Sequence, residues 1–408
     1  MEPTQTGGKQ PLPKRRRWLW RAGQILAVAA VFTLGLFIGN GTISLHRQHG
    51  VAGKLPAKPD YATVDQVYKS LIENYDGKLT ESQILNGLKH GLAESTNDPY
   101  TEYFTPQEAK TFNQELNNQF SGIGAELGQD SEGNLQIIAP IAGTPAAKAG
   151  LQAGDLITSI NGQSTSGMSI DAAVSKIRGK AGTTVKLQIV RDKTKTLTVA
   201  IIRDNITVPS VNTKILPGNV GYLQITSFSD DTADLAQKAA QQFKDKKVNS
   251  IVLDLRNDPG GLLDAAIKVS SLWLPKDKMI LQEKRGSEVV QTYYSEGGDI
   301  LNGVPTVVLV NGGSASASEI TAGALHDNDA AYVMGEKSYG KGVVQQLISF
   351  DDGSQLKVTV ASWYRPDGKN INHRGITPDK AVKEPSGVTA GGKNDAQLQA
   401  AESYLTSH

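Results

Sequence analysis

The residue best suited to act as a nucleophile is Ser316, in the stretch Asn311-Gly-Gly-Ser-Ala-Ser-Ala-Ser-Glu-Ile320. The stretch follows an apolar run at 306–310, and Ser316 and Glu319 have the spacing of a capping box, which predicts a helix beginning at this serine. The amide of Ala317 would then face whatever the hydroxyl attacks, and the positive end of a helix favours an oxyanion. A serine that only caps a helix fits the same pattern, so the motif alone leaves both interpretations open.

A serine hydroxyl needs a base before it can attack, and histidine is the usual one. His326 follows Ser316 by ten residues on the same predicted helix, about 15 Å along the axis and out of reach. Of the remaining histidines, only His373, in a polar loop, could still serve as the base of a Ser-His-Asp triad. Lys341 is the better candidate, with Gln345 four residues later to orient its amine. Burial among apolar groups favours the neutral amine that a base requires.

Several other kinds of chemistry are excluded. The segment from Gly335 to Lys341 copies most of a phosphate-binding loop, but Gly342 stands where Ser or Thr would hold magnesium. The absence of cysteine excludes thiol catalysis, disulfides and cysteine-ligated metals. The net charge is +1, and nothing outside the basic N-terminus suggests nucleic-acid binding. We therefore expect chemistry without a metal or an organic cofactor.

The segments Ser314–Ile320, Ala322–Asp327 and Tyr339–Gln345, together with Leu253-Asp-Leu-Arg-Asn-Asp-Pro-Gly-Gly261, resemble the carboxyl-terminal processing peptidases, a Ser-Lys family that includes tail-specific protease. The resemblance extends from about Tyr61 to Leu405 and implies an α/β core of the crotonase/ClpP-like type.

This resemblance implies a role for each matching residue. Ser316 would be the nucleophile, Lys341 the base and Gln345 its support. The oxyanion hole would use the amide of Ala317 with that of Gly260 or Gly261. The sequence departs from the family pattern at Asp258 (usually Asn), His326 (usually Gln), Ala330 (usually Arg) and Ser338-Tyr339 (usually Thr-Phe).

A second motif lies upstream of the serine. Gly143-Thr-Pro-Ala-Ala-Lys-Ala-Gly-Leu151, Gly154-Asp-Leu-Ile157 and Ile160-Asn-Gly162 resemble the PDZ domain of bacterial proteases. Just before them, the amides of Ile123, Gly124 and Ala125 could form a nest for the carboxylate of a peptide C-terminus, whose backbone would extend the adjacent sheet edge. Arg178, at the end of the predicted helix 170–177, is a candidate for signalling to the protease that a tail is bound.

The chain divides by composition into seven parts. They are a basic tail (1–21) with a net charge of +5, an uncharged run (22–45), a linker (46–60), a helical region (61–116), a β-rich PDZ domain (117–204), the protease core (205–382) and a spacer with a terminal helix (383–408). The run 22–45 would span about 36 Å as a helix, enough to cross a bilayer. The basic residues before it predict a cytoplasmic N-terminus and an extracytoplasmic protease. A cleaved secretory signal is the alternative.

The expected fold is therefore an α+β multidomain chain: a transmembrane helix, a helical segment, a PDZ domain and an α/β serine protease core. The expected function is a membrane-anchored serine endopeptidase that selects proteins by apolar C-terminal tails. A homodimer or a regulatory adaptor is a further possible partner. The main rival is a tethered PDZ binding protein with an inactive protease body, and a trypsin-like protease is disfavoured because its PDZ domain normally follows the protease.

Overall fold

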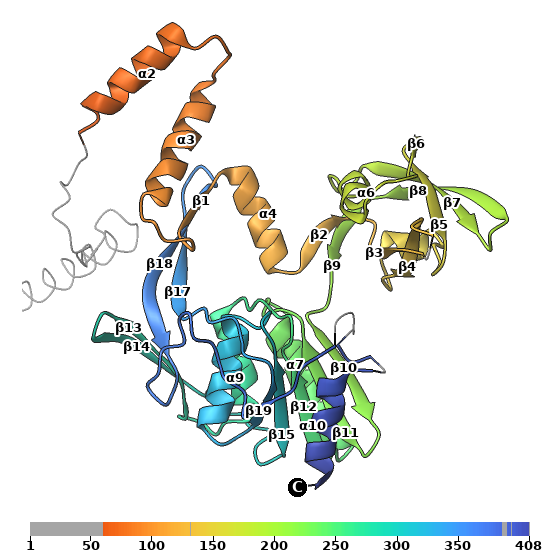
Figure 1. Cartoon of the computed structure of the whole chain (residues 1–408), viewed down its shortest axis with the longest axis vertical. Helices are drawn as coiled ribbons and strands as arrows, with labels where there is room; N and C mark the ends of the chain where they lie inside the picture. The colour runs from red at the N-terminus through yellow and green to blue at the C-terminus, as the bar shows by residue number, and fades with distance from the viewer. Residues whose placement is uncertain (1–59, 131, 386–389, 393, 408) are drawn as a thin grey trace, which may run out of the picture. The chain divides into compact units, whose positions relative to one another are not determined.

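The computed structural model describes residues 60–130, 132–385, 390–392 and 394–407 (Figure 1). The expected basic tail (1–21), membrane span (22–45) and all but the last residue of the linker (46–60) lie outside the described residues. None of the described helices has both the length and the apolar composition needed to cross a bilayer. The chain forms two compact units, Met1–Lys78 and Leu79–His408.

The described part of the first unit is the helix α2 (Ala62–Asn74), which has no buried side chain. The second unit begins with α3 (Glu81–Glu94), capped by Thr80, whose hydroxyl accepts from the Gln83 amide. A short strand β1 (Glu102–Phe104) follows, so the region 61–116, expected to be helical, contains a strand. The helix α4 (Pro106–Leu116) starts at a proline behind Thr105, as the sequence predicts.

The β-rich part combines one main sheet with two helices, of which the helix 170–177 was expected. Its main sheet has the order β3-β4-β5-β7-β8, with β6 beside β5. The bounds are β3 (Ala125–Gln129), β4 (Leu135–Pro140), β5 (Leu156–Ile160), β6 (Gln163–Ser164), β7 (Thr184–Arg191) and β8 (Lys195–Ile202), with the helices α5 (Pro145–Lys148) and α6 (Ile170–Ile177). Alternate residues of β7 (Val185, Leu187 and Ile189) are buried, which gives this part its own core. A separate two-stranded sheet joins β2 (Gln119–Gly122) to β9 (Asp204–Thr207).

The protease core is built on the sheet β10-β11-β12-β15-β16-β19. Its strands are β10 (Val211–Leu216), β11 (Val220–Ile225), β12 (Ser250–Asp254), β15 (Thr306–Val310), β16 (Tyr332–Gly335) and β19 (Lys380–Ala381). All neighbours from β11 onward are parallel, and β10 is antiparallel to β11. This pattern explains why β12 and β15 contain the unbroken apolar runs 251–253 and 307–310: every residue of both strands is buried.

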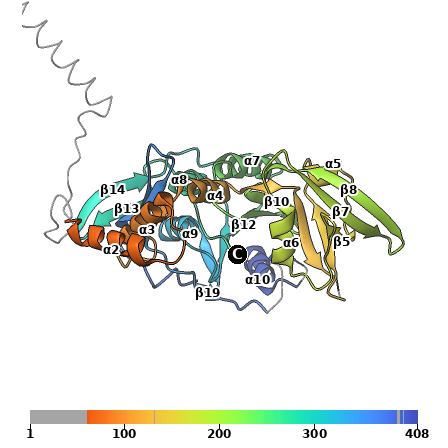
Figure 2. The ribbon, with the colours of Figure 1, turned by 90° about the horizontal axis from the view of Figure 1, so that it is seen from above.

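Helices cover both faces of this sheet. Ile251 and Leu253 belong to the cluster that includes α7 (Thr232–Asp245), α8 (Leu263–Ser271) and α9 (Ala317–Asp327). Val252, between them, belongs to the cluster with Leu398 and Ala401 of α10 (Ala396–Ser407). Figure 2 shows α7 and α8 on one side of the sheet and α10 on the other.

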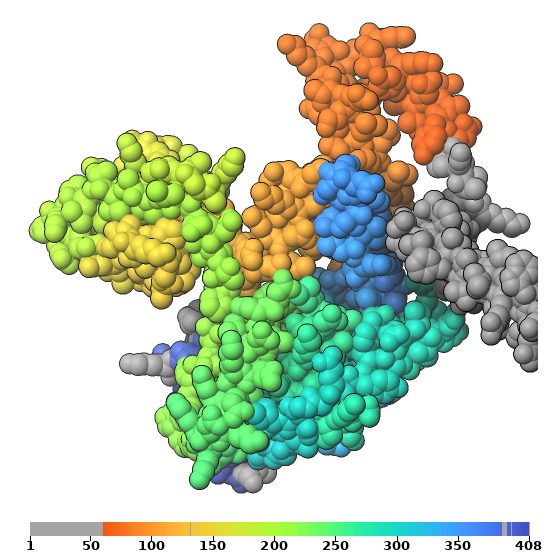
Figure 3. Space-filling model, turned by 180° about the vertical axis from the view of Figure 1, so that it is seen from behind, coloured from red at the N-terminus to blue at the C-terminus, as the bar shows by residue number. Residues whose placement is uncertain are grey.

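A second sheet of the core has the order β1-β18-β13-β14, with β17 also paired to β18. Its members are β13 (Met279–Arg285), β14 (Glu288–Tyr294), β17 (Val343–Ser349) and β18 (Gln355–Tyr364). The register places Glu102 of β1 opposite Lys357 of β18. Figure 3 shows the β17–β18 hairpin (blue) lying against the segment from α3 to α4 (orange). This sheet thus connects the segment before the β-rich part to the strand that follows Lys341.

Candidate active site

Ser316 is the N-cap of α9, immediately after the turn that leaves the buried strand β15. Its backbone has φ 52° and ψ −113°, a left-handed conformation that is rare for a residue with a side chain. Such strain persists only where the surroundings hold it, and it is concentrated at functional sites. The predicted helix start is confirmed, and the strained turn places Ser316 at a cavity wall.

The turn after β12 supports this serine. The carbonyl of Asp258 accepts hydrogen bonds from the Ala315 amide (3.0 Å) and the Ser318 hydroxyl (2.9 Å). At Gly260 (φ 94°) a Cβ would lie 2.6 Å from the Ala315 carbonyl oxygen and 2.8 Å from the Ala317 nitrogen. Only glycine therefore permits the two loops to approach this closely.

The structure distinguishes the two glycines proposed for the oxyanion hole. The amide of Gly260 donates to Asp258 Oδ1 at 2.8 Å and is already occupied. The amides of Gly261 and Ala317 have no acceptor among the described residues. Gly261 is therefore the better partner of Ala317 for binding an oxyanion.

Lys341 lines the same cavity as Ser316, Gly260, Gly261 and Gln345. The cavity has a volume of about 540 Å³ and lies entirely in the second unit. Much of its wall is apolar, with Leu262, Leu281, Ile320, Val343, Val344 and Trp363 among its lining residues. No histidine is found among the described residues that line it, so the structure does not bring His373 to Ser316 as a triad would require.

The environment of Lys341 favours its neutral form. Burial lowers the pKa of the ammonium, and the positive charge of Lys357 lowers it further, while Asp98 and Glu319 act in the opposite direction. Within the described part of the chain, Lys341 Nζ makes no hydrogen bond to Ser316, and its ammonium lies 5.1 Å from the centroid of the Tyr100 ring. The two groups thus share a cavity without being in direct contact.

The carboxylate of Glu319 links the two catalytic candidates, a role that sequence reasoning missed. Its Oε2 accepts from the amides of Ser316 (2.9 Å) and Lys341 (3.0 Å). Its Oε1 accepts from the Gly340 amide (2.7 Å) and the Ser338 hydroxyl (2.5 Å). One buried side chain therefore fixes the nucleophile turn to the loop that carries the lysine. The capping-box spacing indicated the bond to Ser316 but not the other three.

Gln345 lies on the cavity wall at the third position of β17. Its amide nitrogen donates to Thr359 Oγ1 at 3.4 Å and not to Lys341. The loop is held instead through its own main chain: the indole Nε1 of Trp363 donates to the Lys341 carbonyl at 2.9 Å. The support of Lys341 by Gln345 stays a prediction.

The expected peptide nest lies at the start of β3, an edge strand of its sheet. Gly124 has φ 75°, and a Cβ there would lie 2.4 Å from Cβ of Thr144, whose hydroxyl donates to the Gly124 carbonyl. Among the described residues, the amides of Ile123 and Gly124 have no acceptor, and Ala125 begins the strand. Free amides beside an unpaired strand edge are what a terminal carboxylate and an added strand require.

Arg178 is the C-cap of α6, and its guanidinium lies 4.9 Å from the centroid of the Phe120 ring in β2. It therefore contacts the two-stranded connection between the β-rich part and the rest of the unit. This contact is compatible with the proposed signalling role without testing it.

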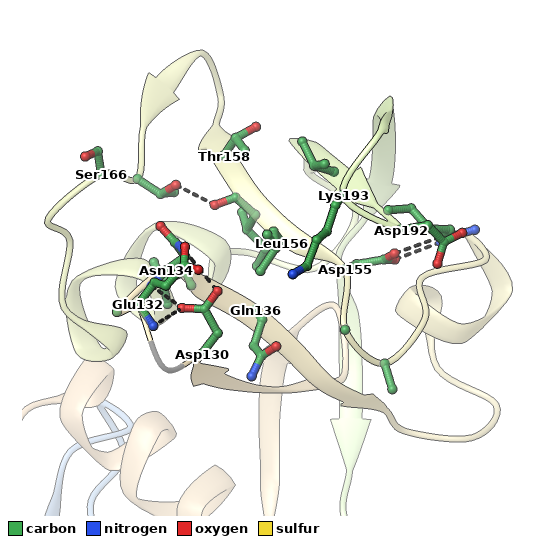
Figure 4. A pocket seen from close by; sticks show the side chains of 18 of the residues that line it. Asp130, Glu132, Asn134, Gln136, Asp155, Leu156, Thr158, Ser166, Asp192 and Lys193 are labelled. Carbon is green, nitrogen blue, oxygen red and sulfur yellow. Dashed lines mark hydrogen bonds and ion pairs between the residues drawn. The ribbon is translucent and has the colours of Figure 1, made fainter.

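A larger cavity, of about 720 Å³, lies in the β-rich part (Figure 4). Two of its acidic side chains already have partners: Asp130 accepts from Asn134, and Asp155 pairs with Arg191 at 2.7 Å. It includes neither Ser316 nor Lys341. Among the described residues, no group of His, Asp and Glu side chains could hold a metal ion. The chemistry therefore belongs to the smaller cavity.

The fold and this site define a serine peptidase core joined to a PDZ domain. The profile described as Peptidase family S41 matches residues 219–382, and a PDZ domain profile matches residues 136–191. The carboxy-terminal processing protease CtpA of Bacillus subtilis is 37% identical over 374 residues, which cover 91% of this chain and 78% of that protein. A CtpA-like relative from Staphylococcus haemolyticus is 36% identical over 90% of this chain and 73% of its own length.

The chain therefore belongs to peptidase family S41 and is a serine peptidase of the carboxyl-terminal processing group. A solved structure from Bacteroides fragilis, assigned to the S41 proteases, matches 87% of this chain and 99% of its own. Its TM-score is 0.57 at 19% identity, which shows the shared fold.

Proposed function

We propose that this chain is a membrane-anchored, extracytoplasmic endopeptidase that selects proteins by their C-terminal tails and cleaves them with Ser316 and Lys341. The observation that carries the proposal is the shared cavity. Its wall includes a serine on a strained helix start, a lysine whose pKa is lowered by burial, and the glycine turn that supplies a free amide.

In this proposal neutral Lys341 accepts the proton of Ser316 as the serine attacks the scissile carbonyl. The amides of Ala317 and Gly261 hold the oxyanion. The ammonium of Lys341 then protonates the leaving amine, and water hydrolyses the acyl-enzyme. Because the lysine is not hydrogen-bonded to the serine in this structure, its side chain must reorient when substrate enters. Contacts of this kind often tighten only in the substrate complex.

Variants of the full chain in detergent test the pair. We expect Ser316→Ala and Lys341→Ala each to lose at least about 10⁴-fold in kcat on an unstructured protein with an apolar tail. The matched controls are Ser287→Ala and Lys337→Ala, an exposed serine and an exposed lysine that both lie outside the cavity wall. Both controls should retain most of the activity. Activity that survives Lys341→Ala would contradict the assignment of the base.

The PDZ part would bind the substrate tail through the amides of Ile123, Gly124 and Ala125. Substrates that differ only in their last three residues test this directly. An apolar tail should lower KM relative to a tail that ends in charged residues, with kcat little changed. Equal KM values would show that the tail is not what the PDZ part recognises.

The evidence for the proposed membrane anchor is the uncharged run 22–45, which directly follows the basic tail. Cell fractionation with an antibody against the C-terminus tests it, because the full-length chain should sediment with membranes and resist extraction by carbonate. Added protease should digest the chain from the outer side only. A chain found free of membranes and shortened at its N-terminus would favour the cleaved signal.

A further inference from the structure

The ammonium group of Lys341 lies against the face of an aromatic ring that belongs to a distant segment of the chain. Nζ is 5.1 Å from the centroid of Tyr100, within the range of a cation–π contact. Within the described residues, Nζ takes part in no hydrogen bond or ion pair, so this ring is the group on which the lysine head rests. Tyr100 is not among the residues that line the cavity, so its ring contacts the lysine without forming part of the cavity wall.

The loop that carries Tyr100 is firmly attached to the sheet beside the site. The carboxylate of Asp98 accepts from the Tyr100 amide (3.1 Å) and the Thr101 hydroxyl (2.7 Å). The same hydroxyl accepts from the amide of Thr359 in β18 at 3.1 Å. Three residues of β1 then pair with β18. The loop that carries the Tyr100 ring is therefore anchored to β18, the strand that pairs with β17.

The charged groups around Lys341 act in opposite directions. Lys357 opposes the ammonium, and it is fixed by an ion pair to Glu102 (2.9 Å) and by the rings of Phe104 and Phe112. Asp98 and Glu319 favour the ammonium. The carboxylate of Glu319 is already shared among four donors. The ring of Tyr100 thus supplies attraction for the ammonium at close range without a hydrogen bond that would fix it in one place.

We propose that Tyr100 is a positioning residue for the reaction: its ring face holds the side chain of Lys341 at the cavity wall and stabilises the ammonium that forms when Lys341 takes the serine proton. The inference rests on the proposed role of Lys341 as the base. An aromatic face suits this task because the amine must move between Ser316 and the leaving group, and the attraction of a ring depends little on the orientation of the N–H bonds.

The test compares the pH dependence of kcat for the full chain and its Tyr100 variants. Because Lys341 must lose its proton before it can act as the base, kcat should rise toward alkaline pH. Tyr100→Leu removes the attraction for the ammonium, so the midpoint of this rise should fall by about half a pH unit. We also expect kcat on the plateau to fall about tenfold, because the lysine head loses its support, while KM stays the same. Tyr100→Phe keeps the ring and should resemble the unmodified enzyme. Tyr100→Trp should move the midpoint upward, since Trp attracts cations most strongly.

Tyr103 provides a matched control in the same segment. The ammonium of Lys89 lies 5.3 Å from the centroid of the Tyr103 ring. The Tyr103 side chain is buried, and it does not line the cavity. Tyr103→Leu disturbs the packing of the segment and should leave the midpoint in place. An unchanged midpoint in both Tyr100→Leu and Tyr100→Trp would overturn the inference, as would equal losses in Tyr100→Phe and Tyr100→Leu. Activity that persists in Lys341→Ala would instead refute the base itself, and this inference with it.

Discussion

Asp258 is a buried carboxyl group whose replacement by asparagine should change how stability depends on pH. The side chain is fully buried and Oδ1 accepts from the Gly260 amide, while Oδ2 has no hydrogen-bond partner in the part of the chain that the structure describes. Burial raises the pKa of this carboxyl to about 8, well above its ordinary value of 3.8. At neutral pH the folded protein therefore holds Asp258 mainly as the neutral acid.

The sign of the effect follows from proton uptake on folding. The unfolded chain releases this proton above about pH 4, and the folded chain keeps it up to about pH 8. The contribution of Asp258 to stability is fully present below pH 4 and is lost as the pH rises toward 8. At about 1.4 kcal/mol per pH unit, the loss between pH 5 and 8 is on the order of 4 kcal/mol.

Asparagine keeps the acceptor for Gly260 and cannot titrate. Its amide nitrogen would occupy the place of Oδ2, at a penalty of about 1–3 kcal/mol that does not depend on pH. Asp258→Asn should therefore be neutral or destabilising at pH 5 and stabilising at pH 8.

Urea unfolding at pH 5, 6, 7 and 8 measures this difference, with the exposed Asp230→Asn as the control. If the stability of Asp258→Asn and that of Asp230→Asn changed with pH in the same way, the reasoning would be refuted, because the proton held by Asp258 would then play no part in folding. Cleavage activity should change little, since the contact to Gly260 is preserved.

Three further predictions concern other parts of the chain. Glu319→Gln should lower kcat about 100-fold with KM unchanged, because an amide cannot accept from all four donors; a normal kcat in a cleavage assay would contradict this. Arg256→Leu should destabilise the core by about 3–5 kcal/mol in urea unfolding, since it removes the positive charge that pairs with the buried carboxylates of Asp254 and Asp395. The pKa of Asp395 is lowered to about 2 by this arginine, with burial acting against the shift. The stabilising effect of ionised Asp395 is present above about pH 4 and is lost as the pH falls toward 2. Arg256→Leu should therefore flatten the acid limb of a plot of unfolding free energy against pH. Gly124→Ala should weaken tail-peptide binding at least tenfold by calorimetry, because its Cβ would collide with Thr144.

The elements that depend on local pattern were predictable from the sequence. The apolar run at 306–310 corresponds to β15, and the helix 170–177 is α6 with the same bounds. The helix beginning behind Ser316 follows from its capping spacing. Each of these depends on residues a few positions apart, whose periodicity and capping groups are read directly from the chain.

The strands of the second sheet were harder to predict. The strand β1 lies in a region that was assigned as helical, and β17 was not anticipated. Short strands gain their stability from the partner they pair with. Their identity therefore depends on register with residues far away in the sequence.

The helix start at Ser316, the family resemblance and the residue types available for catalysis could all be read from the sequence. The packing of the chain was needed to show that the Gly260 amide is occupied, that the Gly261 amide has no acceptor among the described residues, and that Glu319 bridges Ser316 to Lys341. It also brought Tyr100 to a lysine roughly 240 residues later in the chain. Local spacing fixes which groups a turn presents, whereas burial, pKa and contact between separate loops arise only when the sheets and helices pack together.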